Sequence, residues 1–218
     1  TTRLVGSEMC IRDSPYIVGL DKWLGGELDD AAKTYLKDFG AATASNGAVG
    51  LYHVENITPE AVKYGKDLIA ENAKVYVVDD AELQRVYESY PVIWKKKDAK
   101  PKLCFMGCPH MSLQQLIDWT EKVSQSLKEA GRTRVCIPTV FTAAPAVLKK
   151  FQETPYAETL KATGVITSYI CPLMYMNNPL SEKMPVITSS NKLRTYTSAR
   201  YYTDAEILEQ ITKGGADK

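Results

Sequence analysis

The residues best suited to chemistry lie in the segment 102–116 (KLCFMGCPHMSLQQL), where a thiol and an imidazole follow a short run of apolar residues. The pattern of residues 102–106 predicts a strand, which Gly107 and Pro109 should end. Cys108 and His110 are then expected in a turn beyond the carboxyl end of that strand, close to free backbone N–H groups. Such a turn suits an anion, a thiolate or a metal ion.

The elements that position this turn are predicted from the spacing of apolar residues along the chain. Ser112 and Gln115 form an S-x-x-Q capping box that should open a long amphipathic helix. Strand patterns occupy residues 48–54, 74–78, 102–106, 135–138, 165–169 and 185–189, and helical patterns occupy 28–39, 113–130, 143–151 and 156–163, with further helices capped by Thr58, Asp80 and Thr203. This alternation predicts an α/β fold with a mostly parallel sheet and flanking helices.

Polar side chains follow three of the predicted strands at their carboxyl ends. His53 follows the first, Cys108 and His110 the second, and Cys171 the third. A parallel sheet brings such ends to one edge, so these side chains could converge. Cysteine suits iron–sulfur clusters or zinc, although no C-x-x-C spacing is present. The alternatives are loop cysteines without a role and a strand-end histidine that the backbone satisfies.

A second candidate binding feature is the segment 188–196 (TSSNKLRTY), in which hydroxyl, amide and ammonium donors follow an apolar run. Ser189, Ser190 and Lys192 could together hold a carboxylate or a phosphate. A polar turn with a solvated lysine explains the same residues.

Composition narrows the classes of partner. The 218 residues are 44% hydrophobic with a net charge of +1, so a sizeable core is possible and a basic surface for nucleic acid is not expected. No apolar run approaches the roughly 20 residues that span a bilayer, and no signal peptide is evident, so we expect a cytoplasmic protein without membrane contact. The five scattered cysteines are expected to be reduced thiols or metal ligands.

The first residues are set apart. Residues 4–14 (LVGSEMCIRDS) resemble translated sequencing-adaptor DNA, so residues 1–14 are expected to be a non-native leader. Residues 15–218 are then expected to form one α/β region, the carboxyl-terminal fragment of a larger chain.

Four blocks of the sequence resemble the aconitase X family, a group of hydro-lyases related to aconitase. The blocks are GAATASNGAVGLYHVENITPEA (40–61), MGCPHMS (106–112), YICPL (169–173) and TSSNKLRTY (188–196). The H-V-x-x-x-T-P-E-A pattern is the most specific part. The last block departs most, because the family usually has a sequence nearer to T-N-S-x-K.

The resemblance implies an aconitase-like α/β/α fold, an iron or iron–sulfur centre, and dehydration of a small hydroxy acid such as cis-3-hydroxy-L-proline or phosphomevalonate. It implies a small swivelling domain or subunit as partner. It also implies a further amino-terminal half that supplies part of the core, without which this fragment should be inactive. The implied metal ligands are Cys108 and Cys171. The implied catalytic residues are His110, Ser190 and Lys192, and the implied substrate-binding residues are Ser45, Asn46, His53 and Ser189. Met111 stands where a further ligand would be expected.

Two other classes of function are alternatives to a hydro-lyase. A non-catalytic α/β binding or assembly module would explain why a third metal ligand and a general base cannot be identified. A nucleotide-binding protein is disfavoured, because neither G-x-G-x-x-G nor G-x-x-x-x-G-K-[ST] occurs.

Overall fold

The computed structural model describes residues 14–179 and 181–214. Contacts divide the chain into two compact units, Thr1–Tyr90 and Pro91–Lys218, which we call the amino-terminal and the carboxyl-terminal unit. Each unit is described by itself. Most of the expected leader, residues 1–13, lies outside the described residues, so that prediction stays untested.

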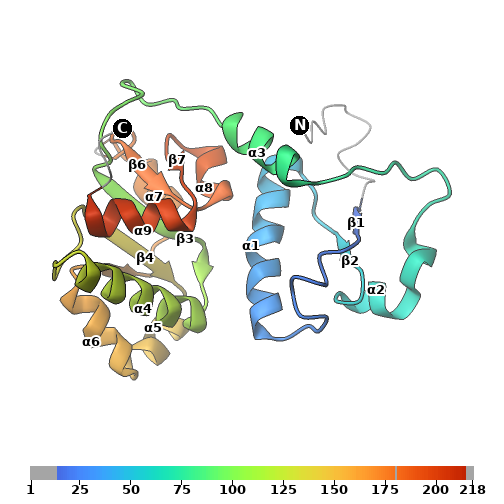
Figure 1. The fold of residues 1–218 in the computed structure, drawn as a ribbon, viewed down its shortest axis with the longest axis horizontal. Helices are drawn as coiled ribbons and strands as arrows, with labels where there is room; N and C mark the ends of the chain where they lie inside the picture. Colours follow the sequence, from blue (N-terminus) through green and yellow to red (C-terminus); the bar gives the residue numbers. More distant parts are fainter. Residues whose placement is uncertain (1–13, 180, 215–218) are drawn as a thin grey trace. The chain divides into compact units, whose positions relative to one another are not determined.

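The amino-terminal unit is mainly helical around a small parallel ribbon (Figure 1). The ribbon pairs β1 (Tyr16–Ile17) with β2 (His53–Val54). Its helices are α1 (Asp30–Gly47), α2 (Pro59–Tyr64), the short 3-10 helix η1 (Gly65–Leu68) and α3 (Asp80–Glu88). The buried apolar cluster of this unit is small and consists of Leu36, Val54 and Ile57.

Three sequence predictions fail in the amino-terminal unit. The helix predicted for residues 28–39 continues through Gly40 to Gly47, and Gly40 packs against the ring of Tyr52, whose hydroxyl donates a hydrogen bond to the Leu36 carbonyl. The strand predicted for residues 48–54 is limited to His53–Val54. The strand predicted for residues 74–78 is not formed, because this segment has no partner strand in the described structure.

The carboxyl-terminal unit contains a five-stranded, fully parallel sheet in the order β5-β4-β3-β6-β7. The strands are β3 (Leu103–Met111), β4 (Thr139–Ala143), β5 (Ile166–Ser168), β6 (Val186–Thr188) and β7 (Arg200–Tyr201). The helices are α4 (Leu113–Glu129), α5 (Pro145–Gln152), α6 (Pro155–Ala162), α7 (Pro172–Met176), α8 (Asn191–Tyr196) and α9 (Asp204–Lys213). The predicted α/β class is therefore confirmed.

Helices cover both faces of this sheet (Figure 1). Residues of α4, α5, α6 and α9 pack with Cys104, Met106 and Phe141 in the larger core. Residues of α7 and α8 pack with Phe105 and Val186 in the smaller core. Successive residues of a strand point to opposite faces, so β3 contributes to both cores and lies at the centre of the unit.

The helix ends in this unit lie close to their predicted positions, whereas some strand ends do not. The capping box of Ser112 and Gln115 is formed, and so is one at Thr203. The strand predicted for residues 135–138 is wrong, since β4 begins at Thr139. Gly107 and Pro109 do not end β3, which continues to Met111 with a shift of its register against β4.

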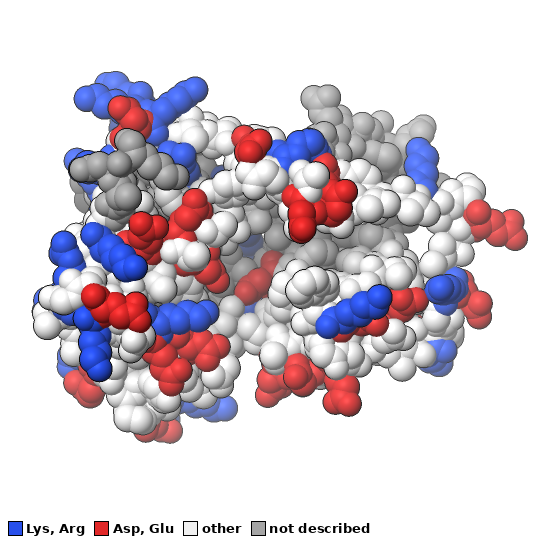
Figure 2. Space-filling model, viewed as in Figure 1, with Lys and Arg blue, Asp and Glu red and all other residues white. Residues whose placement is uncertain are grey.

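The surface agrees with the near-neutral composition. Among the described residues on the face drawn in Figure 2, basic and acidic side chains are interspersed and form no extended basic area. Within residues 14–179 and 181–214, no helix is long and apolar enough to cross a membrane.

Candidate active site

The candidate site lies where the strand order of the carboxyl-terminal sheet reverses. From β3 the chain adds β4 and β5 on one side, then returns to add β6 and β7 on the other. Cys104 of β3 pairs with both Thr139 of β4 and Ile187 of β6. In open parallel sheets a crevice forms beyond the carboxyl ends of the strands at such a reversal, and ligands bind there. The loops after β3 and β6 are therefore the natural place for a site.

Four of the predicted site residues come together at this reversal. Cys108 lies near the end of β3, Cys171 directly precedes α7, and Ser190 and Lys192 lie at the start of α8. The pKa of the Cys108 thiol is raised, first by burial and then by the neighbouring Cys171 thiol. A hydrogen bond with Ser190 and the charge of Lys192 act in the opposite direction. Cys171, Ser190 and Lys192 thus all influence the protonation of the Cys108 thiol.

Ser190 fixes the position of this corner. Its hydroxyl donates a hydrogen bond to the Cys108 carbonyl oxygen and accepts one from the Leu193 N–H at 3.0 Å, which caps α8. The backbone N–H of Ser190 is in turn bonded to the Thr188 hydroxyl at 3.1 Å. The hydroxyl of Ser190 therefore joins the end of β3 to the start of α8.

Ser189 and His110 are placed differently from these four groups. The Ser189 hydroxyl lies 3.6 Å from the Met106 sulfur, on the side of the sheet where that sulfur packs. His110 lies two residues beyond Cys108 in β3 and is half-buried. The expectation that Cys108 and His110 lie in a turn is wrong, because β3 extends through both residues.

Gly107, predicted to end the strand, instead lies within β3 where its register against β4 shifts. Gly107 has φ +98°, and a Cβ at this position would lie 2.3 Å from the Thr142 carbonyl oxygen. The buried Thr142 hydroxyl donates to the Gly107 carbonyl at 2.7 Å. Only glycine allows β4 to approach so closely, so this pair determines the path of β3 just before Cys108.

The donor set fits a thiolate-bound metal in part. The Cys108 and Cys171 thiols are adjacent soft donors of the kind that iron–sulfur centres and zinc use. No group of three or more His, Cys, Asp or Glu side chains suited to a metal occurs in the part of the chain that the structure describes. A metal held by these two thiolates would take its remaining ligands from elsewhere.

The other three predicted site residues lie in the amino-terminal unit. Ser45 and Asn46 belong to the last turn of α1, not to a turn before a strand, and their side chains donate to the carbonyls of Ala41 and Ala42 at 2.8 and 2.9 Å. His53 is buried at 8% exposure, and its Nδ1 has no hydrogen-bond partner among the described residues. Convergence of these three residues with Cys108 stays a prediction.

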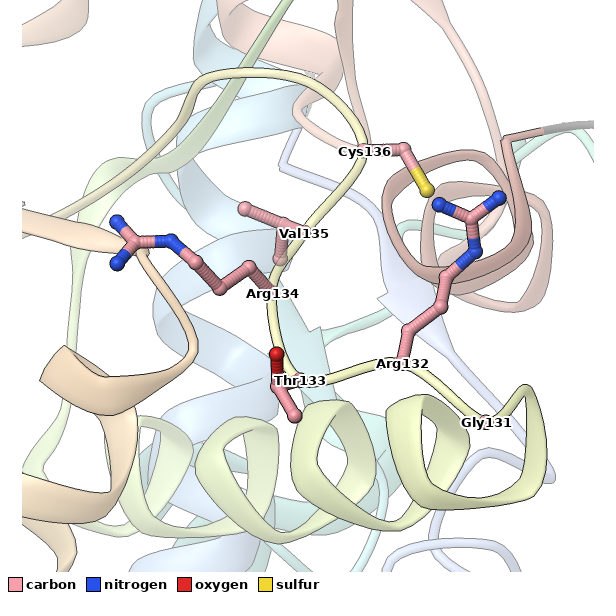
Figure 3. A pocket seen from close by; sticks show the side chains of 6 residues that line it. All are labelled: Gly131, Arg132, Thr133, Arg134, Val135 and Cys136. Atoms are coloured by element: carbon pink, nitrogen blue, oxygen red, sulfur yellow. The ribbon is translucent and has the colours of Figure 1, made fainter.

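One surface depression lies away from this site. A shallow pocket of about 460 Å³ is formed by residues 131–136 of the loop between α4 and β4 (Figure 3). It lies on the chain before β4 begins, whereas the candidate site lies beyond the ends of the strands. The side chains of Arg132 and Arg134 point in different directions in Figure 3, so they do not form a joint anion site.

The fold and the site define an α/β protein with a candidate metal-binding edge at the reversal of its parallel sheet. Comparison with known proteins specifies this class further. A family model described as the aconitase X second domain matches residues 3–88, which end next to the boundary between the two units. A solved structure of aconitase X from Thermococcus kodakaraensis shares the fold, with a TM-score of 0.69 and 24% identity, over 91% of this chain and 47% of that chain.

Curated relatives agree with this match. The phosphomevalonate dehydratase large subunit of Methanosarcina mazei is 30% identical over 165 residues, which are 75% of this chain and 36% of the relative. The protein of the same name from Thermococcus kodakarensis is 31% identical over 58% of this chain and 30% of its own length. The chain thus spans about a third of the length of these relatives. The resemblance to the aconitase X family is confirmed, and the chain is related to its large subunits.

Proposed function

We propose that this chain is part of an aconitase X-type hydro-lyase that removes water from a small hydroxy acid. The observation that carries the proposal is the meeting of Cys108, Cys171, Ser190 and Lys192 at the reversal of a parallel sheet. The names of the relatives favour phosphomevalonate as the substrate, with cis-3-hydroxy-L-proline as the second candidate. The chain itself would be a fragment of the complete catalytic part.

We further propose that Cys108 and Cys171 hold an iron or iron–sulfur centre. When bound, such a centre supplies a Lewis acid to the hydroxyl that leaves the substrate. Burial raises the pKa of Cys108, so its proton must be released when the metal binds, and metal uptake should be favoured at higher pH.

The roles of the other side chains follow from their places. The charge of Lys192 acts on the Cys108 thiol, and its ammonium would neutralise a substrate carboxylate or phosphate. Ser190 lies at the start of α8, and its hydroxyl donates a hydrogen bond to the Cys108 carbonyl at the end of β3. It would therefore act next to Cys108. Ser189 would contact the substrate's anionic group after leaving the Met106 sulfur, and His110 would transfer a proton or orient the leaving hydroxyl.

The amino-terminal unit would supply the remaining substrate contacts through Ser45, Asn46 and His53. Among these, His53 is the strongest candidate, because its buried Nδ1 is left without a partner in the described residues. A small swivelling domain or subunit would complete the enzyme, in keeping with the large-subunit names of the relatives. We place the enzyme in the cytoplasm.

A test of the metal site uses the purified chain, reconstituted with ferrous iron and sulfide without oxygen. We expect bound iron and the visible absorption of a cluster, and we expect Cys108→Ser and Cys171→Ser each to lose most of both. The matched control is Cys136→Ser, since Cys136 is a half-buried free cysteine of the same unit whose thiol donates to the Thr212 carbonyl. Equal iron in all four proteins would refute the site.

A test of the substrate site measures binding of phosphomevalonate to the same chain by calorimetry. Lys192→Met should weaken binding by about tenfold, because one charge-assisted contact is lost. Lys183→Met is the control, since this lysine is exposed and its ammonium lies 3.8 Å from the carboxylate of the neighbouring Glu182. Equal binding by both variants would count against Lys192 as the anion-binding residue.

The second candidate function is a non-catalytic binding or assembly module. It is favoured by the lack of a three-residue metal group within the described residues. A chain that folds, binds no iron and binds neither hydroxy acid would support this alternative over the hydro-lyase.

A further inference from the structure

An unusual apolar segment joins η1 to α3 in the amino-terminal unit. Residues 74–78 read KVYVV, and the exposed fractions of Val75, Tyr76, Val77 and Val78 are 90, 58, 71 and 62%. Valine and tyrosine favour strands, because their side chains pack well on a pleated, half-buried surface. Four such side chains in a row, all exposed to solvent, form an apolar surface. We expect another polypeptide to cover this surface.

The backbone of this segment is ready to pair. Residues 74–78 form neither helix nor strand, and within the described part of the chain no backbone hydrogen bond involves them. The sheet of this unit contains only β1 and β2 among the described residues. An extended segment with exposed N–H and C=O groups is a template on which a further strand can add.

The segment is held in place at its carboxyl end. The Tyr76 hydroxyl donates to a carboxylate oxygen of Glu82, and Glu82 also pairs with Arg85 in α3. Asp79 caps that helix through the Glu82 N–H at 2.8 Å. Side chains alternate along a strand, so a strand formed here would present Val75 and Val77 on the face opposite Tyr76. Their outer face is free to take a partner.

In the described part of the amino-terminal unit, more large apolar side chains are exposed than are buried in its apolar cluster. Of the twenty large apolar side chains exposed in the described residues, fourteen lie between Val18 and Leu83. The buried cluster of the same unit contains three residues. A unit with so small a core gains stability when a partner covers its surface.

The comparisons indicate what the partner is. The matched family model is a second domain, so the family has at least one other domain, and about two thirds of the Methanosarcina mazei large subunit lies outside its match to this chain. We propose that residues 74–78 are a docking strand, on which an apolar strand from that further large-subunit sequence adds by backbone pairing. This proposal does not depend on the dehydratase activity.

Hydrogen exchange tests the proposal directly. The amides of residues 74–78 should exchange fast in the chain alone, at every protein concentration, because they have no partners. The probe is a recombinant polypeptide with the part of the Methanosarcina mazei large subunit that this chain does not match. Adding it should slow exchange at residues 74–78 by at least about tenfold, as expected for amides that enter a paired strand.

Variants separate docking from folding. Val75→Asp combined with Val77→Asp should weaken binding of the probe by about tenfold or more, since a charge in a buried strand face is costly. Val62→Asp is the matched control, because Val62 is 64% exposed and lies in α2 of the same unit. It should change binding less than about twofold.

Each other outcome overturns the proposal. Slow exchange that depends on concentration would assign the strand to a second copy of the chain, and slow exchange at all concentrations would show that the chain covers it itself. Exchange that the probe does not slow, or equal binding of the probe by the double variant and the control, would exclude a docking strand. Binding is measured without substrate or metal, so failure of the proposed enzymatic function would leave these results unchanged.

Discussion

Gly107→Ala is the substitution whose destabilising effect follows most directly from the structure. A Cβ at this position would lie 2.3 Å from the Thr142 carbonyl oxygen and 2.6 Å from the Thr142 hydroxyl oxygen. The first distance is more than about 1 Å inside the optimal separation of non-bonded atoms. The obstacle is backbone of the adjacent strand β4, which cannot turn aside as a flexible side chain can. The strands β3 and β4 must therefore separate next to Cys108.

The cost of this change is the sum of three effects. Alanine at φ +98° is strained by about 1 to 2 kcal/mol, and forcing atoms into a packed site costs about 1 to 3 kcal/mol. Separation of the strands also weakens the 2.7 Å hydrogen bond from Thr142 to the Gly107 carbonyl, which is worth about 1 kcal/mol. We expect a loss of about 3 to 6 kcal/mol, a large part of the stability of an ordinary domain.

Urea unfolding, followed by the fluorescence of the buried Trp119, measures this loss. The control is Gly131→Ala, because Gly131 has φ +65° and nothing within 4 Å of its Cβ position. It should lose only about 1 to 2 kcal/mol from backbone strain. Adding Thr142→Ala to Gly107→Ala should restore little, since the carbonyl oxygen remains. Equal losses at both glycines, or full rescue by Thr142→Ala, would refute the backbone clash.

Two further predictions concern groups outside the candidate site. Trp94→Phe removes the indole hydrogen bond to the Ser198 carbonyl (2.9 Å) and weakens the contact of the ring with the Arg200 guanidinium (5.7 Å), so thermal unfolding should show a loss of about 1 to 2 kcal/mol. The hydrogen bond from Arg85 lowers the pKa of Glu82 to about 2. The ionised Glu82 carboxylate therefore stabilises the folded state above its ordinary pKa of 4.5. This stabilisation is lost as the pH falls towards 2. An NMR titration should show the low pKa in the native protein and a return towards 4.5 in Arg85→Ala, and an unchanged pKa in that variant would contradict the pairing.

Features that depend on residues close in sequence could be predicted. The capping box at Ser112 and the helix cap at Thr203 are formed as expected, because each depends on residues within three positions of the cap. The parallel α/β class also follows from the local alternation of strands and helices. By contrast, Gly40 does not end α1, since the distant ring of Tyr52 packs on it and stabilises the continued helix.

Strand positions were less predictable, because a strand exists only with its partner. Residues 135–138 and 139–143 are both apolar enough to pair, and β3 selects the second set through the register of Cys104 with Thr139. Residues 74–78 have strong strand propensity and remain unpaired in the described structure. Their exposed backbone is the reason that the sequence prediction fails, and it is also what makes the segment a candidate for docking.

The candidate site shows the same division between local and distant information. The sequence places polar residues after the strands that became β3 and β6, but it cannot show that these two strands are neighbours. The pairing of Leu103 with Val186 does so, and it places the sheet reversal between them. Because β3 is central, Cys108 packs in one core with residues of α7 and α8, the helices that follow Cys171 and carry Lys192. Sheet order is therefore what turns separate short motifs into one site, and a change that shifted β6 against β3 would disperse it without altering any of its residues.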